Sequence, residues 1–173
     1  IDSPPLEQCA ALRFCLDASQ PRMRVPQQSA AKASAGKSLI AGSFSALNGA
    51  ARAGFARVSA DGSLDTSFDP GAGFNSVPRR LIVQPDNKII AVGPFSTYNS
   101  TSVSRIVRLL PNGTIDTSFV PVISGSSVDA IDLQPDGRII IGGGFSSVNG
   151  TSRTGIARLE ANGALDTTFN TVF

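Results

Sequence analysis

The strongest constraint on the fold of this chain is an internal repeat. The segment LDTSF at residues 64–68 returns as IDTSF at 115–119 and as LDTTF at 165–169, so its aspartates stand 51 and 50 residues apart. The same two intervals relate four sets of residues: Asp65, Asp116 and Asp166; Arg57, Arg108 and Arg158; Phe44, Phe95 and Phe145; and Asn48, Asn99 and Asn149. Periods of about 20–50 residues are typical of solenoids and propellers. The sequence therefore predicts three copies of one structural unit.

Pairs of Asn or Asp with Gly indicate how many strands each unit contains. Asp136-Gly137, Asn149-Gly150 and Asn162-Gly163 follow one another at intervals of 13 residues. Such pairs favour tight hairpin turns because the central residues of these turns need positive φ. A longer interval of 25 residues, as between Gly62 and Asn87, leaves room for two more strands rich in Ile, Val and Phe. Each unit is predicted to be a four-stranded antiparallel meander.

The predicted fold class is all-β, namely a partial β-propeller of three blades of about 50 residues each. The units span about 36–76, 77–127 and 128–173. The alternative is a β-solenoid, whose coils are usually shorter and need fewer tight hairpins. Helix is disfavoured because no repeat segment carries a 3.6-residue apolar stripe.

Residues 1–35 do not follow the repeat and are predicted to form an irregular N-terminal extension or linker. Residues 7–17 are compatible with a short helix, and the Pro-, Gln-, Ala- and Ser-rich stretch after them is typical of a linker. The first unit then lacks a clear opening strand unless residues 22–25 supply one. Cys9 and Cys15 match neither a CxxC motif nor a zinc framework. The two alternatives for them are a local disulfide and two buried thiols. A chain that starts at Ile1 is expected to be a processed form or a fragment.

Several motifs in a fixed order resemble the delta-60 repeat family, which comprises bacterial β-propeller repeats of large secreted or surface proteins. They are LQPDGRIIIGGGFSSVNG at 133–150, GIARLEANGALDTTF at 155–169, and the parallel segments VQPDNKIIAVGPF and RIVRLLPNGTIDTSF. The resemblance covers about residues 36–173. It implies a propeller fold and an extracytoplasmic location, whether periplasmic, cell-surface or secreted, and the family has no established catalytic site. The chain departs from the family pattern at ASAGKS in the first unit and at Pro94 in the second.

Gly36-Lys37-Ser38 matches the end of a phosphate-binding P-loop, but the repeat explains it better. The motif GxxxxGK[ST] needs a first glycine where this chain has Ala31, and a helix must follow. Aligned by the repeat, Gly36 falls on Asn87 and Gly137, which are hairpin-turn positions. A strand is therefore expected after the motif, and nucleotide binding is not.

The recurrent polar residues are predicted to be structural, and no catalytic, cofactor-binding or metal-ligating residue is predicted. Paired carboxylates act as acid and base only when they share one site, whereas equivalent residues lie on different blades. Each aspartate is expected to accept bonds from its turn and to pair with the arginine of its own blade. The acidic segment at 61–65 does not recur as a calcium loop, and the sequons at Asn99, Asn112 and Asn149 coincide with turn asparagines.

The recurrent phenylalanines are expected in the core, with an aromatic ligand platform as the alternative. The polar loops SALNGAARAG, STYNSTSVS and SSVNGTSRTG are the first place to look for binding, because propeller loops usually carry function.

Composition narrows the function further. Fifteen basic and thirteen acidic residues give a net charge of +2, which does not indicate a nucleic-acid partner. No apolar run approaches the roughly 20 residues of a membrane helix. Histidine, the commonest general base, is absent. We expect a non-enzymatic scaffold or binding module of an extracytoplasmic bacterial protein, without a cofactor. The alternative is a propeller enzyme of lyase or hydrolase type acting on glycans.

The number of blades points to protein partners. Three blades are fewer than the four to eight of an ordinary propeller. Further repeats in the parent gene, copies of the same chain, or another protein are the three ways to cover the open ends, and a glycan ligand is also possible.

Overall fold

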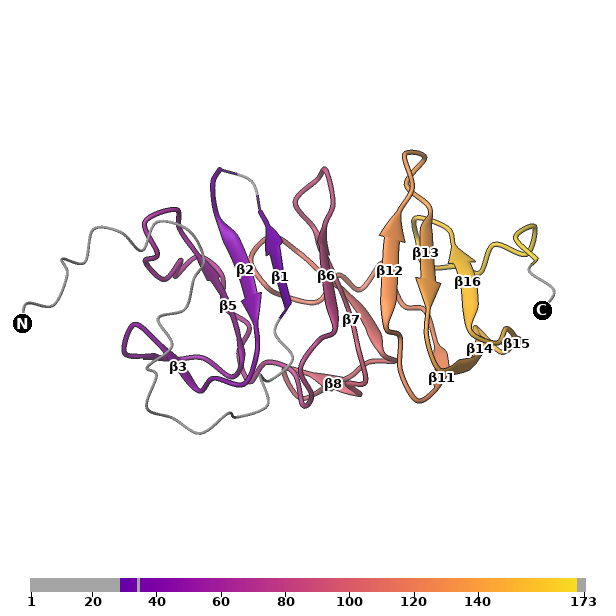
Figure 1. The fold of residues 1–173 in the computed structure, drawn as a ribbon, viewed down its shortest axis with the longest axis horizontal. Helices are drawn as coiled ribbons and strands as arrows, with labels where there is room; N and C mark the ends of the chain where they lie inside the picture. Colours follow the sequence, from indigo (N-terminus) through magenta and orange to yellow (C-terminus); the bar gives the residue numbers. More distant parts are fainter. Residues whose placement is uncertain (1–28, 34, 171–173) are drawn as a thin grey trace, which may run out of the picture.

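The computed structural model describes residues 29–33 and 35–170 of the chain, in which three main β-sheets lie in a row, with smaller sheets beside them (Figure 1). Each main sheet has three antiparallel strands. They are β1 (Ser29–Lys32), β2 (Ser38–Ala41) and β5 (Phe55–Val58); β6 (Arg80–Val83), β7 (Ile89–Val92) and β10 (Ile106–Leu109); and β12 (Ala130–Leu133), β13 (Ile139–Gly142) and β16 (Ile156–Leu159). The second strand is central in each sheet. The structure is thus all-β, as the sequence predicts.

The fourth strand of each unit is reduced to a single antiparallel bridge. Leu64, Ile115 and Leu165 each bridge to the last residue of the third strand of their own unit. Pairing stops there because the next residue is the recurrent aspartate, whose side chain binds the backbone two residues further on and turns the chain. Each unit is therefore a meander of three strands and one bridge.

A short hairpin leaves the sheet between the second and third strands of each unit. The hairpins are β3 (Ala46–Leu47) with β4 (Ala50–Ala51), β8 (Thr97–Tyr98) with β9 (Thr101–Ser102), and β14 (Phe145–Val148) with β15 (Thr151–Ser152). We call these three hairpins the hairpin row, because they lie along one edge of the molecule (Figure 1). In the third unit, β11 (Ile123–Gly125) from the preceding connection pairs with β14.

The prediction for the start of the first unit was wrong. Its opening strand is β1, which lies inside the segment that the sequence assigns to a linker and pairs with β2 along its whole length. The composition SAAK offers no β-branched residue and therefore no strand signal, so the pairing with β2 and the contact with β6 decide the conformation. The possible helix at 7–17, the alternative strand at 22–25 and the two cysteines lie outside the described residues.

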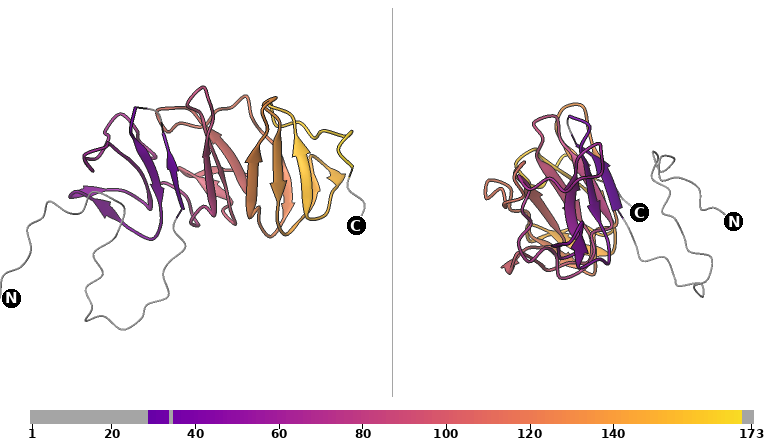
Figure 2. Two further views of the ribbon diagram at one scale, coloured as in Figure 1. Left: turned by 45° about the horizontal axis from the view of Figure 1, so that its top comes forward. Right: turned by 90° about the vertical axis from the view of Figure 1, so that its left-hand side faces the viewer.

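The core lies between successive sheets rather than within any one of them. One cluster joins the first and second units and includes Leu39, Phe55, Phe68 and Ile89, all of which are buried. The other joins the second and third units and includes Phe119. The first strands β1, β6 and β12 lie side by side across the units, as the innermost strands of adjacent blades do (Figure 2). Each unit therefore buries its apolar faces only against its neighbours.

One turn glycine in each later unit makes this close packing possible. Gly113 has φ +95°, and a Cβ there would lie 2.7 Å from the carbonyl oxygen of Asp69 and 3.2 Å from the ring of Phe68 in the preceding unit. Gly163 occupies the same position against Phe119. Only a residue without a side chain allows this approach at this φ.

Gly113→Ala is expected to lower the free energy of unfolding by about 1–3 kcal/mol through backbone strain alone, with a further loss from the clash across the junction. Gly137→Ala is the matched control, because its φ is +85° and the nearest atom to a new Cβ is 3.8 Å away. Urea unfolding measures both. Equal losses in the two variants would contradict the role of Gly113 at the junction.

Candidate functional site

The recurrent aspartates lie at the edge of each sheet, directly after the bridge. Asp116 is buried and accepts from the backbone N–H and the hydroxyl of Ser118, at 3.0 and 2.6 Å. Its other carboxylate oxygen accepts from Arg108 Nε at 2.8 Å and lies 3.2 Å from Lys88 Nζ. Asp65 and Asp166 make the same set of contacts in their own units. Each of the three recurrent aspartates therefore has two cations and one hydroxyl group as partners.

Two of the recurrent arginines, Arg57 and Arg108, each join their own unit to the next one. Besides Asp116, Arg108 binds the hydroxyl of Ser118 and donates from Nη1 to the carbonyl oxygen of Ala161 at 2.6 Å. Its guanidinium carbon lies 4.6 Å from the centre of the Phe119 ring. In the first unit, Arg57 donates to the carbonyl oxygen of Pro111 at 2.5 Å and covers Phe68. We call Arg57/Asp65, Arg108/Asp116 and Arg158/Asp166 the arginine–aspartate ladder.

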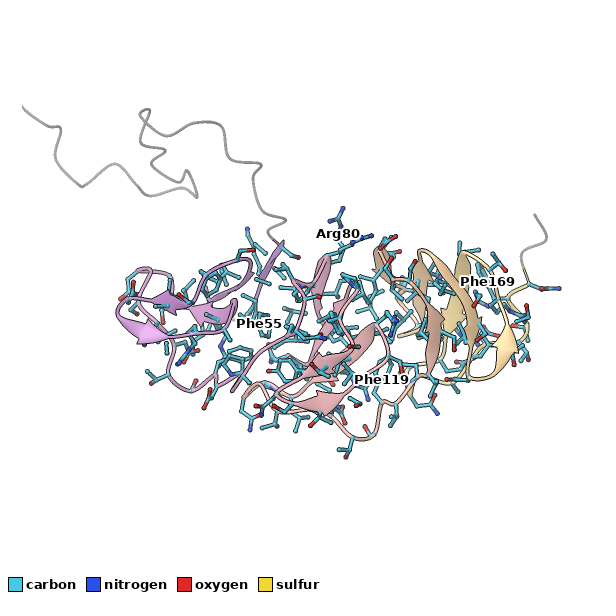
Figure 3. The ribbon with its side chains drawn as sticks, turned by 90° about the horizontal axis from the view of Figure 1, so that it is seen from below. Phe55, Arg80, Phe119 and Phe169 are labelled. Carbon is cyan, nitrogen blue, oxygen red and sulfur yellow. The ribbon has the colours of Figure 1, made fainter. Side chains whose placement is uncertain are left out.

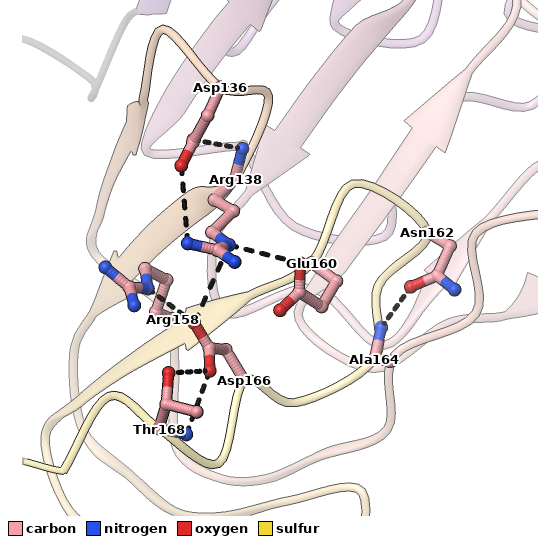
Figure 4. Close-up of polar contacts among 8 residues, drawn as sticks. All are labelled: Asp136, Arg138, Arg158, Glu160, Asn162, Ala164, Asp166 and Thr168. Atoms are coloured by element: carbon pink, nitrogen blue, oxygen red, sulfur yellow. Dashed lines mark hydrogen bonds and ion pairs between the residues drawn. The ribbon is translucent and has the colours of Figure 1, made fainter.

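The third unit shows the ladder at the end of the row (Figure 4). Arg158 Nε lies 2.7 Å from Asp166, and Arg138 reaches both Asp166 and Glu160. The sequence predicts the arginine–aspartate pairs, and the structure contains all three. The second cation on each aspartate, which is Lys37, Lys88 or Arg138, was not predicted, although these three residues align at one repeat position.

Electrostatics make the ladder a poor acid–base site. Burial by itself would raise the pKa of Asp116, but hydrogen bonds from Ser118, Lys88 and Arg108 outweigh it and hold the pKa well below its usual range. The pKa of Asp65 is lowered in the same way, by Lys37, Ser67 and Arg57 against the effect of burial. A carboxylate held ionised so strongly is a weak general base at neutral pH. The ladder is suited to holding units together.

The recurrent phenylalanines occupy related but unequal positions. Phe95 and Phe145 are buried, and Phe95 packs against Phe74 with ring centres 4.6 Å apart. Phe44, in the first unit, is only half-buried.

The recurrent asparagines stabilise the hairpin row. Asn149 accepts a hydrogen bond from the N–H of Val122 and donates one to the carbonyl oxygen of Gly163, so both ends of its side-chain amide are already bonded.

The tips of the hairpin row are exposed and consist of Asn-Gly in the first and third units and Asn-Ser in the second. The residues at these tips are Asn48 and Gly49, Asn99 and Ser100, and Asn149 and Gly150. Arg52 and Arg153 directly follow the hairpin strands β4 and β15, and Arg105 directly precedes β10; each is half-buried. Arg52 and Arg153 bond only the carbonyl oxygen of the preceding residue among the described contacts. The hairpin row thus offers small polar tips along one edge, and an arginine follows each hairpin in the sequence.

Two polar features depart from the repeat, and sequence reasoning missed both. Tyr98 is buried and donates to the carbonyl oxygen of Gly113 at 2.6 Å; burial and, next, the charge of Asp69 raise its pKa. Arg79, just before β6, forms an ion pair with Asp129, just before β12. The bond of Tyr98 lies within the second unit, and the Arg79–Asp129 pair joins the second unit to the third. They were hidden because each occurs once, so the repeat gave no alignment for them.

A cavity of about 210 Å³ lies between the first and second units. Its lining residues are Ala33, Ala35, Lys37, Arg57, Asn87, Ile89 and Pro111. Lys37 binds Asp65 and Arg57 binds Pro111, so the charged groups in its wall already have partners. Within residues 29–33 and 35–170, no three His, Cys, Asp or Glu side chains group as metal ligands would, and no helix is long and apolar enough to cross a membrane. Ser38, the last residue of the P-loop-like triplet, begins strand β2.

Comparison with known families agrees with this geometry. The family described as "Domain of unknown function (DUF5122) beta-propeller" matches the chain three times, at residues 36–68, 84–119 and 134–169. The chain belongs to this family. The three matched segments end at Phe68, Phe119 and Phe169, the phenylalanines that lie under the arginines of the ladder. No curated protein and no solved structure matches the chain significantly.

Asp116→Asn is expected to lower the free energy of unfolding by about 2–3 kcal/mol, because it removes the charge between two buried or half-buried cations. Asp132→Asn is the matched control, since Asp132 is exposed on β12 of the next unit. Thermal and urea unfolding of both variants measure the difference. A fully stable Asp116→Asn protein would refute the structural role of the ladder.

Stability is also expected to fall in acid. The ladder carboxyls have lowered pKa values in the folded protein, so the unfolded chain binds more protons as the pH falls through about 4. Their contribution is complete above that pH and is lost below it. Urea unfolding at a series of pH values should show this loss, and it should be smaller in Asp116→Asn. A flat profile down to about pH 2 would contradict it.

Proposed function

We propose that the chain is a non-enzymatic repeat scaffold or binding module of an extracytoplasmic bacterial protein, of the delta-60 kind, that mediates protein–protein or surface interactions within a larger assembly. The observation that carries this proposal is the division of its polar residues. The recurrent arginine–aspartate pairs bind each other within their units, and Arg108 also binds the next unit. The hairpin row carries exposed polar tips, and its Arg52 and Arg153 bond only the preceding carbonyl oxygen among the described contacts.

The hairpin row is suited to a broad contact with a repetitive partner. Its three hairpins follow one another at the spacing of the units and lie along the same edge (Figure 1). The guanidinium groups of Arg52, Arg105 and Arg153, which follow these hairpins in the sequence, favour partners that carry carboxylate or sulfate groups. Acidic polysaccharides of a cell surface present such groups at regular intervals. We take them as the probe for this surface.

The proposed module binds acidic polysaccharide without cleaving it. Affinity electrophoresis in gels that contain polygalacturonate or alginate is expected to retard the protein, with neutral xylan gels as reference. Arg52→Ala/Arg153→Ala should lose most of the retardation, because two of the three arginines of the row are removed. Arg80→Ala is the matched control: Arg80 is exposed on β6 and, like the other two, bonds the carbonyl oxygen of the preceding residue.

The same mixtures, assayed for new reducing ends and for unsaturated uronides, test the alternative function. Product that accumulates with time would overturn the proposal in favour of a glycan lyase or hydrolase. Retardation that survives in the double arginine variant would remove the hairpin row as the binding surface.

A further inference from the structure

The two junctions within the chain are built from the same four parts. An arginine donates to a turn carbonyl of the next unit, and a phenylalanine beneath that arginine packs against the turn glycine that follows. The sets are Arg57, Phe68, Pro111 and Gly113 at the first junction, and Arg108, Phe119, Ala161 and Gly163 at the second. In both, the phenylalanine and the glycine are buried. The junction is therefore a defined contact between two complementary faces.

The third unit presents one half of this junction at the end of the row. Arg158 lies over Phe169 at 4.8 Å from the ring centre and binds Asp166, as its equivalents do. Phe169 is only half-buried, whereas Phe68 and Phe119 are 0% and 3% exposed. Among the described residues, Nη1 of Arg158 has no acceptor. Figure 3 shows Phe119 between two units and Phe169 near the end of the row.

The first unit presents the other half. Ala60 and Gly62 align with Pro111 and Gly113 in the repeat. Gly62 is exposed, and nothing lies within 4 Å of a Cβ built on it, in contrast to the tight contacts at Gly113 and Gly163. Its φ of +81° shows that the turn already has the conformation of the later units. The carbonyl oxygen of Ala60 is thus placed as the acceptor of an arginine.

We propose that a second copy of this chain docks head to tail, with Arg158 and Phe169 of one copy on the Ala60–Gly62 turn of the other. The chain carries both halves of one self-complementary contact, so no other surface chemistry is required. Two copies bring together six units, a number within the four to eight of propellers. Such a contact is heterologous and closes into a ring or continues as a chain of copies. The inference goes beyond the proposed function, because it concerns the ends of the row and not the hairpin row.

Light scattering after gel filtration of the full chain, over a concentration series, tests the proposal. We expect at least twice the chain mass of 17.9 kDa. Gly62→Asn should weaken association at least about tenfold, because its side chain would enter the space that Phe169 occupies. Asn tolerates positive φ, and Gly137→Asn is the matched control, since Asn87 stands at that turn position in the second unit with φ 65°.

Mixing two variants gives the sharper test. Phe169→Ala removes the tail half of the contact and keeps the head, whereas Gly62→Asn removes the head and keeps the tail. Each variant alone is expected to have the mass of one chain, with an unchanged melting temperature for Gly62→Asn relative to Gly137→Asn. Their equimolar mixture should form a two-chain species through the one intact contact.

A wild-type chain that stays at 17.9 kDa at every concentration would overturn the proposal. So would association that Gly62→Asn leaves unchanged, or a mixture of folded variants that fails to associate. Polysaccharide retardation is measured on Gly62→Asn in parallel. Loss of self-association with retained retardation separates this contact from the function of the hairpin row.

Discussion

The structure depends on the contact between one unit and the next. Within a unit, three short strands and one bridge enclose no core of their own, and the buried clusters form only where two sheets meet. The arginine of the ladder serves both levels, because its Nε holds the aspartate of its own unit while its Nη1 reaches the neighbour. Loss of the aspartate therefore loosens the group that joins the units, which makes local and inter-unit stability inseparable.

The depth of burial explains why recurrent charges are tolerated at these junctions. A buried charge is costly unless it is paired and hydrogen-bonded. Each carboxylate of the ladder has an arginine, a second cation and a neighbouring hydroxyl, and each arginine lies over an aromatic ring. The charges and hydrogen-bonding groups of these residues are therefore paired with one another. That pairing is the physical reason to look for binding at the hairpin row instead.

Much of the fold follows from the repeat. The sequence predicts the Asx-Gly turns and a structural unit as long as the interval between Asp65 and Asp116, because turn chemistry and repetition specify them. It also predicts the pairing of arginine with aspartate. The opening strand β1 could not be predicted, since its small residues take their conformation from β2. The Arg79–Asp129 pair and the bond of Tyr98 were equally out of reach, because contacts between distant segments that occur once leave no periodic trace.

The identical construction of the two junctions has a consequence for how such a protein changes in length. The carbonyl acceptor, the turn glycine and the arginine–phenylalanine pair occupy fixed positions in each repeat, so any unit can in principle follow any other. Duplication or deletion of a whole unit would leave every remaining junction with its full set of contacts. Insertions of a few residues, by contrast, are accommodated only in the hairpins, where the chain already leaves the sheet. The molecule is modular at the scale of 50 or 51 residues.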